Sequence, residues 1–393
     1  MDAILIYGQS NAGIGGETPA TFTCATDANE AVGFLKGSGV WGATPFEPEL
    51  ISGIAKLTNP PSSPLALMVP AAVALEQFVR DGGAASPRWF WHTVSNGGQP
   101  IQEFLRGTQT YDNLLIAANR FAVAARASGT IPIVRAVAWV QGESRSPDYA
   151  ASLSSLIATL VPDIMTQTGQ GVAPKFLILQ INNAIQETWF HTSALDQLAV
   201  ARDSDECILI GPMYYTPLGL FTVSPPDGLH GTEIGRMMTG EMLALCCKAL
   251  FHDYIDWVPL VPLALKRDDN EITIQFSKPT YGRGLAWDTM WVGSNVNYGF
   301  FYGDEQSSAE LASVTLDSAN YQVVLTLTGP STGMNPFVSY AMGPGGQAIL
   351  APWPGNRGQL ISPTAQHSTF HRLGYAVPRT VNHYAARFQL LIT

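Results

Sequence analysis

Two patterns of apolar and polar residues divide the chain near residue 255. In the first part, short apolar runs alternate with longer segments that have helical spacing. The short runs are ILIY (4–7), FWHTV (90–94), VRAVAWV (134–140), KFLILQI (175–181) and ECILIG (206–211). The longer segments cover 71–80, 111–127, 149–165 and 231–251. This alternation predicts parallel strands connected by helices, and the uninterrupted apolar strands predict a sheet that is covered on both faces.

The pattern changes after Trp257. Short runs that often alternate between apolar and polar residues follow, separated by Gly, Pro, Asn and Asp. The runs are EITIQFS, MWVG, YGFFYG, ASVTLD, YQVVLTLT, FVSYAM and FQLLIT. They are typical of an antiparallel β-sandwich. We therefore expect two domains, residues 1–255 and residues 256–393, with the Pro-rich segment 257–265 as the boundary.

Residues 13–63 fit neither pattern. They are rich in Gly, Pro, Thr and Ser and show little periodicity. A stretch of this length without secondary structure is uncommon in a compact domain and is usually functional. We expect this segment either to contain small elements that the pattern does not reveal or to serve the site that begins just before it.

The charge of the chain limits its partners. Only 13% of the 393 residues are charged, and the formal net charge is −10. A nucleic-acid surface needs a basic face, so we expect no nucleic-acid partner. No uninterrupted apolar run of about 18 residues is present, so we expect no membrane insertion. The chain starts MDAILIY without a basic leader, so we expect no signal peptide in this sequence. A polar but weakly charged surface suits neutral, hydroxyl-rich ligands.

A serine follows the first predicted strand. The run ILIY continues into Gly8-Gln9-Ser10-Asn11. The carboxyl ends of parallel strands are where open α/β sheets build their sites, so Ser10 is a candidate nucleophile. The alternative interpretation is a helix N-cap, a common position for serine.

A histidine and an aspartate lie near the end of the first part. The segment Pro226-Asp227-Gly228-Leu229-His230 precedes a long predicted helix. An aspartate three residues before a histidine can hold one ring nitrogen and leave the other to take a proton from a hydroxyl. Taken alone, the pattern also fits a capping aspartate and a surface histidine. With Ser10, it predicts a Ser-His-Asp triad.

Two further strand ends offer hydrogen-bond donors. Ser95-Asn96-Gly97-Gly98 follows FWHTV, and glycine lets backbone N–H groups approach a ligand closely. Trp139-Val140-Gln141-Gly142-Glu143-Ser144 ends the next strand and brings a side-chain amide at Gln141. Such donors can form an oxyanion hole. An ordinary strand-to-helix turn and a polar strand end are the alternatives.

These four blocks, GQSN, GG, WxQGES and DGLH, occur in the order found in a known superfamily. The sequence resembles the SGNH (GDSL-type) hydrolases, in the branch of sialate O-acetylesterases and related carbohydrate acetylesterases. The resemblance covers residues 4 to about 250 and implies an α/β fold, a parallel-sheet, three-layer, flavodoxin-like hydrolase domain followed here by a smaller antiparallel β-sandwich domain. It implies Ser10 as nucleophile, with His230 and Asp227 completing the catalytic triad.

The resemblance also implies the roles of neighbouring residues. The oxyanion hole would use Ser10, Gly98 and Gln141, and spacing alone leaves Gly97 as an alternative to Gly98. Gln9, Asn11 and Glu143 would support the site, with Glu143 holding its loop. Arg145 stands where the family usually has aspartate, so substrate contacts are expected to differ there. Trp41 is a candidate for stacking on a sugar ring, and also for a loop anchor.

We therefore expect a serine esterase that removes O-acetyl groups from a carbohydrate, with no cofactor and no metal. Esterase action on a lipid or small-molecule ester is the alternative enzyme function. A catalytically inactive glycan-binding or phage-tail module is the alternative from another class. The second part resembles accessory domains of polysaccharide-acting bacterial or phage-tail proteins, so we expect an extracellular, cell-surface or virion-associated location. The sugar, the acetylated position and the oligomeric state stay open.

Overall fold

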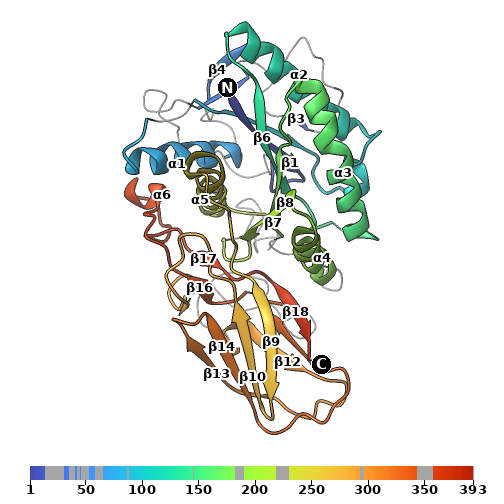
Figure 1. Ribbon diagram of the computed structural model, residues 1–393, viewed down its shortest axis with the longest axis vertical. Helices are drawn as coiled ribbons and strands as arrows, with labels where there is room; N and C mark the ends of the chain where they lie inside the picture. The colour runs from blue at the N-terminus through green and yellow to red at the C-terminus, as the bar shows by residue number, and fades with distance from the viewer. Residues whose placement is uncertain are drawn as a thin grey trace.

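The structure of the chain is a computed structural model. The structure describes residues 1–13, 31–34, 40–41, 45, 53–57, 65–85, 88–144, 146–181, 190–217, 230–292, 296–342 and 357–392. Figure 1 shows an upper part with helices around a sheet and a lower part that consists mainly of strands.

A mostly parallel sheet forms the centre of the first part. Its strand order is β4-β2-β5-β1-β6-β7-β8, with β3 also paired to β5. The central strand β1 (Asp2–Gly8) pairs in parallel with β5 (Phe90–Ser95) and β6 (Ile133–Val140). The other strands are β2 (Val32–Phe34), β3 (Val40–Trp41), β4 (Ile54–Lys56), β7 (Lys175–Gln180) and β8 (Cys207–Pro212). The described residues of the irregular segment 13–63 thus include three short strands that its sequence pattern did not reveal.

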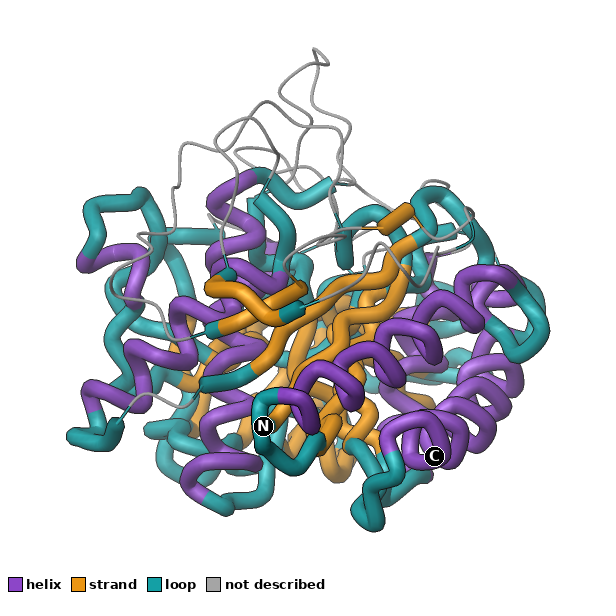
Figure 2. Tube along the Cα trace, turned by 90° about the horizontal axis from the view of Figure 1, so that it is seen from above, coloured by secondary structure: helices purple, strands orange, loops and turns teal. Residues whose placement is uncertain are grey.

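Helices cover both faces of this sheet. On one side α1 (Met68–Asp81) packs against α5 (Glu233–Lys248), which continues into the π-helical turn η3 (Ala249–Asp253). On the other side α3 (Tyr149–Thr168) packs between α2 (Gln109–Ala127) and α4 (Phe190–Asp203). Figure 2 shows these helices flanking the strands. The sheet between them is therefore buried on both faces, as its apolar strands require.

Helix α3 is the one described helix that is long and apolar enough to cross a membrane by length and composition. Leu153, Leu156 and Leu160 are buried, while Ser154 and Ser155 are exposed. A helix that covers a sheet has this two-sided character.

In the described residues of the second part, the strands form three small antiparallel sheets. The largest has the order β13-β14-β10-β9, and the others have the orders β11-β16-β17 and β12-β15-β18. Their strands are β9 (Pro262–Asp268), β10 (Glu271–Phe276), β11 (Ala286–Trp287), β12 (Phe300–Gly303), β13 (Leu311–Asp317), β14 (Gln322–Leu327), β15 (Phe337–Tyr340), β16 (Leu360–Ser362), β17 (His383–Tyr384) and β18 (Phe388–Leu391). The predicted fold class, an α/β hydrolase-type domain followed by a β-sandwich, is confirmed.

Strand β9 begins at Pro262, within the Pro-rich segment 257–265. One detail of the predicted second part is wrong. The run MWVG does not start a strand, since residues 290–292 lie outside any strand. The side-chain oxygen Oδ1 of Asp288 accepts hydrogen bonds from the backbone N–H groups of Met290 (3.1 Å) and Trp291 (2.7 Å). These bonds form a turn that competes with strand pairing.

The two parts share buried hydrogen bonds at the carboxyl ends of β7 and β8. The side chain of Gln180 donates from Nε2 to the backbone oxygen of Arg387 (3.1 Å) and accepts the Arg387 N–H at Oε1 (2.7 Å). The Tyr214 hydroxyl donates to the backbone oxygen of Ala385 (2.7 Å). Because both partners of each bond are buried, separating the two parts would leave polar groups unpaired in an apolar surface.

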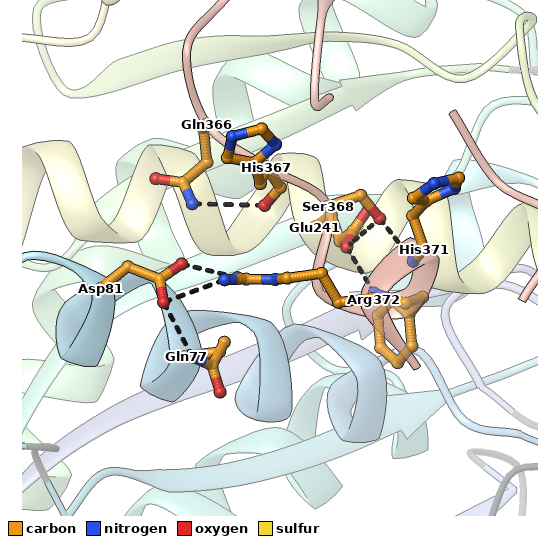
Figure 3. Close-up of polar contacts among 9 residues, drawn as sticks. Gln77, Asp81, Glu241, Gln366, His367, Ser368, His371 and Arg372 are labelled. Atoms are coloured by element: carbon orange, nitrogen blue, oxygen red, sulfur yellow. Dashed lines mark hydrogen bonds and ion pairs between the residues drawn. The ribbon is translucent and has the colours of Figure 1, made fainter. Parts of the chain in front are cut away.

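A second contact joins the parts around Glu241, in the middle of α5. Its Oε1 accepts hydrogen bonds from the Ser368 hydroxyl (2.8 Å) and the Phe370 N–H (3.1 Å), at the start of the short helix α6 (Thr369–Arg372). Close by, the Arg372 guanidinium binds both carboxylate oxygens of Asp81 at the end of α1. Figure 3 shows these two contacts side by side. Together they fix α6 on the helical layer formed by α1 and α5.

Burial dominates the ionisation of Glu241. Desolvation raises its pKa to about 7, against the lowering effect of the hydrogen bonds from Ser368 and the backbone of Phe370 and Thr369. At pH values between the ordinary pKa of glutamate and about 7, Glu241 is protonated in the folded protein and ionised in the unfolded chain. The unfolded state then binds fewer protons, so the free energy of unfolding falls as pH rises through this window.

We predict that Glu241→Gln removes this pH dependence. The amide oxygen still accepts from Ser368 and Phe370, but no charge has to be buried. Relative to the variant, the wild type should lose up to about 3 kcal/mol of unfolding free energy between pH 5 and pH 7.5. Denaturant titrations of both proteins across this range measure the difference. Burial lowers the pKa values of His92 and His383 to about 4. Their contribution to the pH dependence of unfolding is the same in both proteins and cancels in the comparison. Parallel curves for the two proteins would contradict the prediction.

Candidate active site

The loop that carries Ser10 starts from a glycine enclosed by two strands. Gly8 accepts a hydrogen bond at its backbone oxygen from Asn96 N (2.9 Å), and the next residue, Gln9, donates its N–H to Val140 O (2.9 Å). Gly8 has φ +154°, and a Cβ at this position would lie 2.0 Å from Val140 O. Only glycine therefore lets β1 turn out of the sheet at this point.

Ser10 and His230 meet across 220 residues of sequence. The distance from His230 Nε2 to Ser10 Oγ is 2.8 Å. Ser10 is 9% exposed, so its hydroxyl lies in a largely dehydrated position. Residues 10–13 form a turn, and within them no helix begins that Ser10 could cap. The structure thus brings together two of the three predicted triad residues, while Asp227 lies outside the described residues.

The buried Arg236 connects the two loops that hold this pair. From the first turns of α5, its Nε donates to Gly231 O (3.2 Å), directly after His230. Its Nη1 donates to Gly13 O (2.7 Å), just past Ser10, and to Leu65 O (2.8 Å). The sequence analysis did not identify Arg236. Nothing in its local sequence marks it, because its acceptors are backbone oxygens of distant segments.

The predicted oxyanion-hole residues come from neighbouring strand ends. Gly98 is exposed with φ +71°, in the left-handed region that glycine adopts without strain. Gln141, fully buried, donates from Nε2 to Gln99 O (3.1 Å), which places its amide beside the glycine block. An NH₂ group has a second hydrogen to offer. These positions leave both Gly97 and Gly98 as possible donors.

A polar network behind Gln141 holds its backbone. Gln141 O accepts hydrogen bonds from the Tyr149 hydroxyl (2.7 Å) and from Gln197 Nε2 (2.8 Å). Gln197 also accepts the Ile181 N–H at Oε1 (3.0 Å), and it lies on α4, a helix that the sequence pattern did not predict. The apolar pattern of this helix is weak. Among its residues whose side chains are described, the buried ones are Ser193, Ala194, Gln197, Leu198 and Val200, and two of these are polar.

Asn11 and Glu143 form a buried pair next to Ser10. Asn11 Nδ2 donates to Glu143 Oε1 (2.8 Å), and Asn11 Oδ1 accepts the Gly231 N–H (3.0 Å). Glu143 is 2% exposed, and desolvation raises its pKa, opposed by the hydrogen bond from Asn11 and by the charge of His230. The two residues thus connect the loop of Ser10 with the loops of Gly231 and Glu143.

Of three other predicted residues, one is described in full, one in part and one not at all. Gln9 is fully buried, and within the described part of the chain its amide atoms have no hydrogen-bond partner. The backbone of Trp41 pairs with Ser95 at the end of β5, near the glycine block, but its side chain is not described. Arg145 lies outside the described residues.

One comparison with known proteins shows the fold. No family model matches the chain, and no curated protein matches it in sequence. A carbohydrate acetylesterase from Xanthomonas citri has a similar structure, with a TM-score of 0.59 and 14% identity over 99% of this chain and 80% of that one. The fold, including its second part, is therefore that of a solved carbohydrate acetylesterase.

Two other solved structures resemble the chain over a smaller share of its length. NanS matches with a TM-score of 0.46 and 11% identity over 64% of this chain and 98% of its own. An inhibitor-bound aryl esterase of M. smegmatis matches with a TM-score of 0.34 and 15% identity over 64% of this chain and 100% of its own.

We predict that Gly8→Ala destabilises the protein severely, whereas Gly129→Ala does not. Both glycines have positive φ, but a Cβ on Gly129 meets nothing within 4 Å, and a Cβ on Gly8 collides with Val140 O. Gly129→Ala should cost about 1 kcal/mol for its left-handed backbone. Gly8→Ala should cost about 4 kcal/mol or more, since the β1–β6 pairing has to shift. Denaturant unfolding compares the two, and equal losses would contradict the assignment of close packing at Gly8.

Proposed function

We propose that this protein is a serine esterase that removes O-acetyl groups from a carbohydrate. The observation that carries the proposal is the 2.8 Å contact between Ser10 Oγ and His230 Nε2 at the carboxyl edge of the sheet. The likeness of the whole chain to the fold of a carbohydrate acetylesterase supports it. So does the order of the four sequence blocks, from GQSN to DGLH.

In the proposed reaction His230 acts first as a base. Its Nε2 takes the hydroxyl proton of Ser10 while Oγ attacks the acetyl carbonyl carbon. The tetrahedral intermediate collapses when His230 returns this proton to the sugar oxygen, which leaves as a hydroxyl group. The products of this half are an acetyl-Ser10 enzyme and the deacetylated sugar. Asp227 is proposed to hold the other ring nitrogen of His230 and so to fix its tautomer.

The negative oxygen of the intermediate needs donors at the same edge. We assign this role to the backbone N–H groups of Ser10 and Gly98, with Gly97 as the alternative to Gly98, and to Gln141 Nε2. Gln141 is suited to it because its backbone is fixed by Tyr149 and Gln197. Water, activated by His230, then attacks acetyl-Ser10 and releases acetate. No step in this scheme requires a cofactor.

The first test of this function combines kinetics with stability. Ser10→Ala removes the nucleophile and His230→Ala removes the base, so each should lower kcat on p-nitrophenyl acetate by about a million-fold. The double variant should be no worse than Ser10→Ala, because the two residues act as one unit. The melting temperature should barely change.

A fluorophosphonate should label wild-type Ser10 stoichiometrically and leave Ser10→Ala unlabelled. An unlabelled wild type would favour the inactive glycan-binding module. Near-normal turnover by Ser10→Ala would exclude the proposed mechanism.

The second test concerns the acyl group. An acetylesterase should hydrolyse p-nitrophenyl acetate much faster than the octanoate, with a graded decline through the butyrate. Each methylene that a small pocket rejects changes the transition-state free energy by roughly 1–3 kcal/mol. Values of kcat/KM across the series measure this. Equal or higher rates on octanoate would favour action on lipid esters instead.

A further inference from the structure

The orientation of the Asn11 amide follows from its partners. The backbone N–H of Gly231 can only donate, so the atom that faces it at 3.0 Å must be the oxygen Oδ1. The nitrogen Nδ2 then faces Glu143 Oε1 at 2.8 Å, where a carboxylate accepts. The two hydrogen bonds are consistent with one another, and each end of the amide has a defined role.

One of these hydrogen bonds joins the same two loops as the contact between Ser10 and His230. Asn11 follows Ser10 in sequence, and Gly231 follows His230. The bond from Gly231 N to Asn11 Oδ1 therefore joins the same two loops as the contact between Ser10 Oγ and His230 Nε2. Glu143 adds the third loop, the one that leaves β6 with Gln141. One side-chain amide thus sets the relative position of three loops.

The surroundings make this bridge rigid. Asn11 is 7% exposed and Glu143 is 2% exposed, so water offers little competition for their hydrogen bonds. Within the described residues, Glu143 Oε2 has no hydrogen-bond partner, so the bond from Asn11 carries much of the polar contact of this carboxyl group. Loss of the Asn11 donor would leave a buried carboxyl without this bond, and the loop would shift to rehydrate it.

We propose that Asn11, anchored by Glu143, is a positioning residue that holds the Ser10 and His230 loops at the separation that proton transfer requires. The inference rests on the proposed function, because it needs Ser10 and His230 to react with each other. A displacement of about 1 Å between reacting groups can lower a rate by about 100-fold. The bridge therefore acts on kcat more than on the binding of a small substrate.

The test exchanges donor and acceptor between the two positions. Asn11→Asp keeps an oxygen for Gly231 but turns the Nδ2 donor into an acceptor that faces Glu143, so kcat on p-nitrophenyl acetate should fall about 100-fold. KM should change less than threefold. Adding Glu143→Gln to Asn11→Asp restores the bond with its direction reversed. This double variant should recover kcat to within about tenfold of the wild type, and its rate of fluorophosphonate labelling at Ser10 should recover in parallel.

Gln170→Ala is the matched control. Gln170 is also a bridging amide: its Oε1 accepts from Val134 N (2.7 Å) and its Nε2 donates to Val134 O (2.9 Å), but at the opposite end of β6. Its loss should lower the melting temperature and leave kcat unchanged. If Asn11→Asp fails to fold, the comparison of Glu143→Ala with Glu143→Gln makes the same test, because the glutamine keeps an acceptor for Asn11 and the alanine does not.

Three results would overturn the inference. The first is an unchanged kcat in Asn11→Asp while the wild type is active and labelled at Ser10, which would leave the proposed function intact. The second is a loss of kcat that the exchange does not repair. The third is a wild type that is neither active nor labelled at Ser10, which would overturn the proposed function as well.

Discussion

The parallel pairing of β1 with β5 and β6 determines where the chemistry can occur. In this register Gly8 lies opposite Ser95 on one side and opposite Val140 on the other. The three strands therefore end at the same level, and the residues that follow them leave the sheet side by side. Ser10, the glycine block and Gln141 come from these ends. These residues lie close together because the three strands end in register, and the loops make only small adjustments to their positions.

Loops at such an edge contain backbone groups that no sheet pairing satisfies. In this chain, side chains from other elements form hydrogen bonds with many of them. Arg236 donates to backbone oxygens of the Ser10 loop, of the His230 loop and of the segment before α1. Gln197 donates to the backbone oxygen of Gln141. Burying a guanidinium is costly unless it is hydrogen-bonded, so Arg236 stabilises the site only while all three carbonyls keep their places. A chain with few charges thus places one of them where it fixes the geometry of the site.

This division explains what the sequence could and could not predict. Long apolar runs and helical spacing were sufficient for β1, β5, β6, β7, β8 and four of the helices, because burial on both faces leaves a strong pattern. The apolar pattern did not predict helix α4, because its buried face includes the polar residues Ser193 and Gln197. The meeting of Ser10 with His230 was predictable from strand ends and sequence blocks. The contacts of Arg236 and the hydrogen bonds of Asn11 with Glu143 and Gly231 were not, because their partners are backbone atoms or distant residues that only the fold brings near. The resemblance implied only that Asn11 and Glu143 support the site.

The same edge also serves the second part of the molecule. While β1, β5 and β6 end at the candidate site, β7 and β8 end against the β-rich part, where the guanidinium of Arg357 donates to Thr216 O (3.1 Å). The next residue, Pro217, accepts at its backbone oxygen the N–H of Thr232 (3.1 Å), two positions after His230. A short path of hydrogen bonds thus leads from the second part to the histidine loop. The β-rich part therefore contacts the chain beside the segment that carries His230, and the change of sequence pattern near residue 255 does not mark a gap in hydrogen bonding.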